Sequence, residues 1–193
     1  MNKKGRLFVV SAPSGAGKTT LCEKIIKRVR GVVRSVSMTT RQKRPGEKEG
    51  VDYFFVTVEE FKERIKANEF IEYAKVFDEY YGTPRKFVEI NLNKNKDVVL
   101  TIDVQGAMQI RKNIKRACIF IFIVPPSIKD LRKRLQKRKT DSVKAINNRL
   151  KIAKKELTFL KYYDYEVIND DMKTAFEELK AIFIASRCKR GKT

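Results

Sequence analysis

Cysteine is scarce in this sequence, whose 193 residues include only Cys22, Cys118 and Cys188. The three stand far apart and form no C-x-x-C pair, so they indicate neither a zinc site nor a disulfide framework. Cysteines so far apart fit a reducing compartment, and we therefore expect the protein to be cytoplasmic.

Long apolar runs are missing as well. The first apolar stretch, residues 7–12, ends before Pro13 and Gly15, which makes it too short for a signal peptide or a membrane span. Internal repeats and low-complexity tracts are also absent, apart from a basic tail at residues 187–193. We expect one folding unit without membrane contact.

Acidic side chains are the minority, with 23 Asp and Glu against 44 Lys and Arg, a formal net charge of +21. A net charge of this sign attracts phosphates of any kind, so nucleic acids, anionic membranes and nucleotides all remain possible ligands. The charge is unevenly spread, because residues 129–161 carry 13 basic and 3 acidic side chains, whereas residues 47–79 carry 10 acidic and 5 basic ones. A plain nucleic-acid groove does not need that acidic segment, so we expect no dedicated nucleic-acid partner. Weak, salt-sensitive binding of nucleic acid stays open.

Strand and helix patterns alternate along most of the chain. This alternation predicts an α/β fold with a five-stranded parallel sheet that binds ligands at the carboxyl ends of its strands. Four of these strands can be located, and each is followed by a helical pattern. The strands are predicted at residues 7–12, 98–104, 118–124 and 165–168, and the helices at residues 20–29, 107–114, 128–135 and 172–185.

Two segments interrupt this alternation. Residues 37–81 mix turn signals and aromatic strands at 53–56 and 70–76 with a short helix at 58–66, which indicates a small separate lobe. Residues 145–160 have apolar side chains at spacings of three and four, a pattern typical of a helix whose other face is cationic.

The stretch SAPSGAGKTT, residues 11–20, matches the phosphate-binding loop G-x-x-x-x-G-K-[ST] except that Ala12 replaces the first glycine. Gly15 and Gly17 allow successive backbone N–H groups to face one anion. Lys18 can then reach the β and γ phosphates, while the Thr19 hydroxyl can ligate Mg²⁺. The alternative is a glycine-rich turn followed by a chance Lys-Thr pair.

Asp103 lies at the end of a predicted strand, in TIDVQG. A carboxylate there can hold Mg²⁺ through water or accept a hydrogen bond from a substrate. It can also cap the following helix, and the two roles can coexist.

Three further segments carry candidate ligand-binding side chains. In SVSMTTRQKRPGEKEGVDY the guanidinium groups of Arg41 and Arg44 suit phosphate oxygens. In EFIEYAKVFDEYYGTPR the Glu72 carboxylate can accept the N1–H and 2-amino hydrogens of guanine. In RKRLQKRKTDSVKAINNRL two or three of the arginines can close over a transferring phosphoryl group. The alternative for each is a solvated, charged surface.

Taken together, SAPSGAGKTT, SVSMTTRQKRPGE, GVDYFF, EFIEYAKVF, YYGTP, IDVQGA and VINDD resemble, in this order and spacing, the guanylate kinase family from about residue 5 to residue 187. The resemblance implies one unit with a core, an inserted GMP-binding lobe and a mobile lid. It also implies the transfer of a phosphoryl group from ATP to GMP with Mg²⁺. We expect ATP, GMP and dGMP as substrates, and a monomer or homodimer. The expected parts are the core at 1–36, 87–128 and 159–193, the lobe at 37–86 and the lid at 129–158.

The resemblance also assigns site residues. The GMP-binding residues would be Ser37, Arg41, Arg44, Tyr53, Glu72, Tyr81, Thr83 and Asp103. The ATP-binding residues would be Ala12, Pro13, Ser14, Gly15, Ala16, Gly17, Lys18, Thr19, Thr20, Arg134, Asn169 and Asp170. The catalytic residues would be Lys18, Arg44, Arg138 and Arg149, with Thr19 as the metal ligand.

The chain departs from the family pattern at a few positions. Thr101 stands where the family usually has an aspartate, and Lys137 and Lys139 stand where it often has glycines, whereas Ala12 is an accepted variant. Two other functions remain open at this point. One is a non-catalytic module that binds phosphopeptides in the lobe, and the other is a kinase for a different phosphorylated acceptor.

Overall fold

The computed structural model describes residues 5–76, 78–114, 117–137 and 142–189. Strands in this part of the chain form two sheets, of which the larger has five parallel strands. The predicted α/β fold with a five-stranded parallel core is therefore confirmed. The strands lie in the order β2 (Val32–Arg34), β7 (Asp97–Thr101), β1 (Leu7–Ser11), β8 (Cys118–Val124) and β9 (Tyr165–Ile168).

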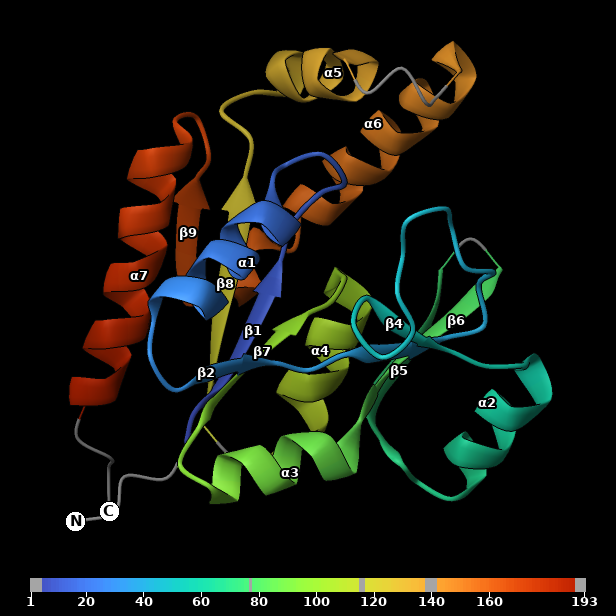
Figure 1. Cartoon of the computed structure of the whole chain (residues 1–193). Coiled ribbons are helices and arrows are strands. Elements are labelled where there is room, and N and C mark those ends of the chain that lie inside the picture. The colour runs from blue at the N-terminus through green and yellow to red at the C-terminus, as the bar shows by residue number, and fades with distance from the viewer. Residues whose placement is uncertain (1–4, 77, 115–116, 138–141, 190–193) are drawn as a thin grey trace.

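Helices cover both faces of this sheet (Figure 1). On one face lie α1 (Lys18–Arg28) and α7 (Met172–Cys188), where the rings of Phe8 and Phe183 stack with centroids 3.9 Å apart. On the other face lie α3 (Arg85–Asn93) and α4 (Val104–Asn113). Because both faces are covered, the central strands are apolar without alternation.

The second sheet has four strands in the order β4 (Tyr53–Phe55), β3 (Ser37–Thr39), β6 (Glu79–Pro84) and β5 (Phe70–Val76). It lies to one side of the parallel sheet, together with α2 (Val58–Lys66) (Figure 1). Its own small core contains Met38, Phe61 and Phe70. Strand β5 is an edge strand of this sheet and faces α4 of the core.

Beyond the carboxyl ends of the parallel strands lie α5 (Ile128–Lys137) and α6 (Val143–Leu157), followed by a 3₁₀ helix at Leu160–Tyr162 (Figure 1). The two α-helices share an apolar cluster of their own, formed by Leu131, Leu135, Ile146, Leu150 and Ala153. None of the helices in the described part of the chain has both the length and the apolar composition needed to cross a bilayer.

Several element boundaries differ from the sequence-based expectation. The strand predicted over residues 98–104 ends at Thr101, because Asp103 caps α4 and Val104 is already helical. The helix predicted over residues 145–160 spans Val143–Leu157 instead, since the Ser142 hydroxyl caps it by accepting the Ala145 N–H. Strands β2, β3 and β6 and helix α3 were not located from sequence.

Candidate active site

The loop between β1 and α1 has the backbone geometry of an anion-binding loop. Gly15 and Gly17 have φ angles of 94° and 95°, in the left-handed region that side chains disfavour. A hydrogen bond from outside the loop holds it in place, because the Asn169 amide donates to the Ala16 carbonyl at 2.7 Å. Arg134 in turn donates to the Asn169 carbonyl at 2.7 Å. Two residues predicted to bind ATP thus support the loop.

Lys18 begins α1 and joins this loop to the end of β7. Its Nζ donates to the Ile102 carbonyl at 3.0 Å, and the Ser11 hydroxyl donates to the Asp103 carbonyl at 3.4 Å. Burial lowers the pKa of Lys18, an effect that the charges of Asp103 and Glu156 partly offset. The ammonium therefore lies at the carboxyl edge of the sheet, beside two carboxylates.

The remaining predicted ATP residues lie around the same loop. Ala12 is buried and belongs to the apolar cluster between the sheet, α1 and α7. Thr19 and Thr20 are exposed in the first turn of α1, and Asp170 is exposed just after β9. Pro13 is buried in the loop, where its carbonyl accepts the Ala16 N–H at 3.0 Å.

One of the predicted lid arginines contacts the loop between β1 and α1. Arg149 on α6 donates from Nη1 to the Ser14 hydroxyl at 2.9 Å. Its predicted partner Arg138 lies outside the described residues, as does Lys139. Lys137 is the last residue of α5.

A buried carboxylate lies between the second sheet and α4. Glu72 of β5 is 5% exposed, and the Thr83 hydroxyl donates to its Oε1 at 2.5 Å. Burial raises the pKa of Glu72 to about 7, the Thr83 hydrogen bond opposes that shift, and the charge of Asp103 adds to it. Asp103 caps α4, since its Oδ1 accepts the N–H groups of Gln105 at 2.8 Å and Gly106 at 2.9 Å. Both roles weighed for Asp103 remain compatible, and the capping role is confirmed.

The guanidinium of Arg41 lies close to two other predicted GMP-binding residues, Tyr53 and Tyr81. The guanidinium lies 5.4 Å from the ring centroid of Tyr53, whose ring meets that of Tyr81 edge to face at 6.0 Å. It also donates to both carboxylate oxygens of Glu47, at 2.7 and 3.0 Å. Arg44 is exposed on the same loop, and its backbone N–H donates to Glu47 at 2.8 Å. Ser37 opens the adjacent strand β3.

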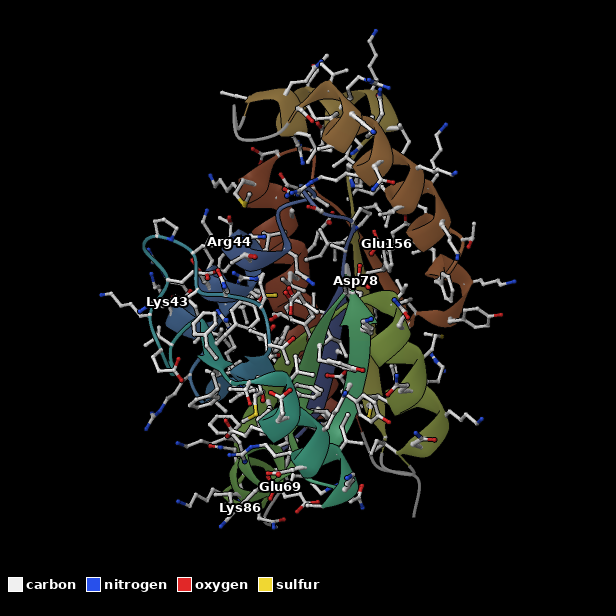
Figure 2. The ribbon with its side chains drawn as sticks, turned by 90° about the vertical axis from the view of Figure 1, so that its right-hand side faces the viewer. Lys43, Arg44, Glu69, Asp78, Lys86 and Glu156 are labelled. Carbon is white, nitrogen blue, oxygen red and sulfur yellow. The ribbon has the colours of Figure 1, made fainter. Side chains whose placement is uncertain are left out.

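Two acidic residues in the site were missed by sequence analysis. Glu47 holds Arg41, and its position within the motif SVSMTTRQKRPGE could have drawn attention to it. Glu156 on α6 carries a pKa raised to about 7 by burial, and the charge of Lys18 lies close enough to oppose that shift. Figure 2 shows Glu156 on α6 and Arg44 on the loop before β4, on opposite sides of the view.

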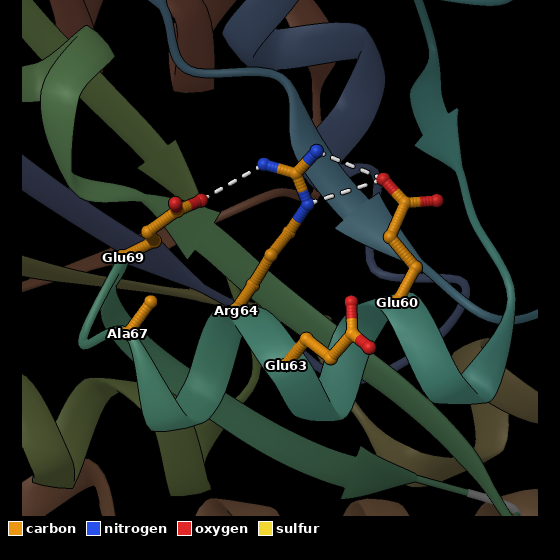
Figure 3. A pocket seen from close by; sticks show the side chains of 5 residues that line it. All are labelled: Glu60, Glu63, Arg64, Ala67 and Glu69. Carbon is orange, nitrogen blue, oxygen red and sulfur yellow. Dashed lines mark hydrogen bonds and ion pairs between the residues drawn. The ribbon is translucent and has the colours of Figure 1, made fainter.

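A surface cavity of about 250 Å³ on α2 lies elsewhere and is lined by Glu60, Glu63, Arg64, Ala67 and Glu69 (Figure 3). The Arg64 guanidinium is already paired with Glu60 and Glu69, each at 2.8 Å. This cavity contains none of the predicted site residues.

A parallel sheet whose first strand leads through the GAGKT loop into a helix, with two arginines and a buried carboxylate carried by a second sheet and its loops, is typical of P-loop kinases of nucleoside monophosphates. A family model described as Guanylate kinase matches residues 4–186. The chain belongs to the guanylate kinase family, and the predicted enzyme, a kinase that uses ATP to phosphorylate GMP, is confirmed.

Individual relatives agree with this assignment. The chain is 48% identical to the guanylate kinase of Caldanaerobacter subterraneus subsp. tengcongensis, over 98% of this chain and 91% of that protein. It is equally similar to the guanylate kinase of Thermotoga maritima, at 48% identity over 96% and 89%. The crystal structure of guanylate kinase from Anaplasma phagocytophilum superimposes with a TM-score of 0.82 at 36% identity, covering 97% of this chain and 89% of that one.

Proposed function

We propose that an oxygen of the GMP phosphate attacks the γ-phosphorus of ATP in line, while the bond from this phosphorus to the β–γ bridging oxygen breaks, so that GDP forms and ADP leaves. The transfer needs neither a covalent enzyme intermediate nor a dedicated general base. The observation that supports this proposal is the continuity of the site. Lys18 contacts Ile102, the next residue is Asp103, and Asp103 caps the helix turn that contacts Glu72. One short segment therefore joins the phosphate end of the site to its base-recognition end.

In this proposal the phosphate-binding loop and Lys18 hold the ATP phosphates, supported by Arg134 and Asn169. Arg41, Arg44, Tyr53 and Tyr81 bind the GMP phosphate, and Ser37, Glu72, Thr83 and Asp103 bind guanine. Arg138 and Arg149 neutralise the charge of the transferring group. Lobe 37–86 closes on GMP and lid 129–158 closes on ATP, which excludes water from the reaction.

The side chains around Lys18 also fit Mg²⁺. They offer hard oxygen donors, namely the exposed Thr19 hydroxyl in the first turn of α1 and the carboxylates of Asp103 and Glu156, whose charges act on Lys18. The ion would arrive with ATP, with Thr19 as its protein ligand, and would neutralise phosphate charge. Together with the scattered cysteines, a nucleotide substrate pair supports our proposal that the enzyme works in the cytoplasm.

The identity of the acceptor can be tested at Glu72. Replacing Glu72 with alanine removes the acceptor for the N1–H and 2-amino groups of guanine. We expect the ratio of kcat/KM for GMP to that for AMP to fall on the order of 10²-fold, since a hydrogen bond to a charged group contributes about 1.5–3 kcal/mol. Steady-state kinetics with GMP, dGMP, AMP and IMP, at saturating ATP and Mg²⁺, measure this ratio.

The matched control for this test is Glu69→Ala, which removes an exposed carboxylate just before β5. It should leave the preference for GMP unchanged. An unaltered ratio in Glu72→Ala would refute the proposed base-recognition site.

The raised pKa of Glu72 predicts a pH dependence. Burial favours the neutral acid, whereas guanine requires the carboxylate, so kcat/KM for GMP should rise as pH increases through about 7. The rise should be shallower in Glu72→Gln, whereas Glu69→Ala should show the same rise as the unaltered enzyme. Ionisation of the GMP phosphate is common to all three proteins, so it accounts for the part of the rise that remains in Glu72→Gln. A rise in Glu72→Gln as steep as in the unaltered enzyme would contradict the assignment.

The pH dependence of stability that Glu72 causes is opposite in direction to that of kcat/KM. Because the folded state binds the Glu72 proton more tightly than the unfolded state, this carboxyl group contributes stability below its ordinary pKa of 4.5. That contribution is lost as pH rises through about 7.

A further inference from the structure

We infer that Gly106 and Gln109, both on α4, are positioning residues that set the place of the Glu72 carboxylate and thereby the preference for guanine. The inference rests on the proposed role of Glu72 and goes beyond it, because neither residue is proposed to touch a substrate. Glu72 is in β5 of the second sheet, whereas α4 covers the parallel sheet, so these two residues hold one part of the molecule against the other.

Gly106 leaves room for the carboxylate. A Cβ at this position would overlap Glu72 Oε2 and would lie 3.0 Å from Glu72 Cδ. Glycine inside a helix is otherwise unfavourable relative to alanine. Gly106 has no positive φ angle, so the space around it decides whether a side chain fits. Glu72 approaches it most closely, and Ile102 Cδ1 would lie 3.3 Å from the same Cβ.

Gln109, one turn later, holds the backbone next to Glu72. Its amide nitrogen donates to the Tyr73 carbonyl at 2.6 Å, and its amide oxygen accepts the Tyr73 N–H at 3.2 Å. Strand β5 lies at the edge of its sheet, so the outer backbone groups of Tyr73 have no neighbouring strand to pair with. The Gln109 side chain takes the place of that strand.

The same turn of α4 also fixes the second carboxylate of the site. The Gly106 N–H donates to Asp103 Oδ1 at 2.9 Å, while the α-carbon of Gly106 faces Glu72. Asp103 precedes α4 and Glu72 lies in β5 of the second sheet, yet both contact this one residue. Their spacing, and with it the shape of the guanine site, therefore depends on α4.

The first experiment substitutes Gly106 with alanine in two backgrounds. In the otherwise unaltered enzyme, Gly106→Ala should raise KM for GMP about tenfold or more, because misplacing a binding group by about 1 Å can cost up to 10²-fold. KM for ATP should not change, and Tm should fall. In the Glu72→Ala background the same change should raise Tm, since alanine is the better helix former once the carboxylate is gone. A higher Tm in both backgrounds with an unchanged KM for GMP would overturn the inference.

The second experiment uses Gln109→Ala, with Asn113→Ala as the control because Asn113 carries an exposed amide on the same helix. Gln109→Ala should raise KM for GMP about fivefold, as expected for lost neutral hydrogen bonds, with kcat and KM for ATP retained. The control should match the unaltered enzyme. Equal GMP kinetics in both variants would overturn the role of Gln109.

The variants distinguish the proposed function of Glu72 from the positioning role of Gly106 and Gln109. If Glu72→Ala keeps its preference for GMP, the proposed function of Glu72 is wrong, and the positioning role falls with it. If Glu72→Ala loses that preference while Gly106→Ala and Gln109→Ala behave like the unaltered enzyme, only the positioning role is overturned.

Discussion

Replacing Arg149 with alanine is expected to lower kcat about 10³-fold, the lower end of the range for arginines that neutralise a transferring phosphoryl group. The structure motivates this expectation because Arg149 extends from α6 to the Ser14 hydroxyl in the phosphate-binding loop. Coupled measurement of ADP formation under saturating ATP and GMP provides kcat. We expect a similar loss for Arg138→Ala.

The control for Arg149 is Lys151→Ala, which removes an exposed cation from the same helix. If the general positive field of α6 were responsible, both variants would lose activity to a similar degree. Near-normal turnover in both Arg149→Ala and Arg138→Ala would show that the proposed mechanism is wrong.

Substitution of Lys18 with methionine is the second change with a large expected effect. Methionine retains most of the apolar stem but removes the ammonium that would hold the β and γ phosphates. We expect kcat to fall by about 10³-fold, as when a preorganised electrostatic contact to a transition state is deleted. Steady-state kinetics with ATP and GMP measure this loss.

Thermal unfolding separates this effect from misfolding. Burial lowers the pKa of Lys18, which means that the folded state disfavours its charge. Lys18→Met should therefore not lower Tm, although the hydrogen bond to Ile102 is lost. A large drop in Tm together with the loss of activity would indicate a structural rather than a catalytic role.

Local patterns predicted the parts of the fold that are determined locally. The apolar strands β1, β7 and β8 are continuous because helices cover both of their faces, and the glycines before Lys18 mark the turn into α1. Strand β2, by contrast, has only three residues, Val32–Arg34, and is a strand because it pairs with β7. No local pattern specifies such a pairing.

In the candidate site, too, some residues could be predicted from the sequence and others could not. Glu72 and Arg41 could be selected because their side chains suit guanine and phosphate. The contact of Asn169 with Ala16 joins residues 153 positions apart, and the contacts of Gly106 and Gln109 with β5 join a helix of the core to the second sheet. Chemistry alone does not reveal these supporting residues, because they act through packing between distant segments of the chain.

The apolar cluster shared by α5 and α6 has an energetic consequence. Two of its members, Leu131 and Leu135, also lie against Gly15 of the phosphate-binding loop, beside the hydrogen bonds that Arg134 and Arg149 make in the loop region. A change in the tilt of the two helices relative to this loop would therefore expose leucine side chains to water as well as break hydrogen bonds. The hydrophobic effect thus favours the arrangement in which α5 stays packed on the glycine of the loop, and a side chain at position 15 would disturb that packing.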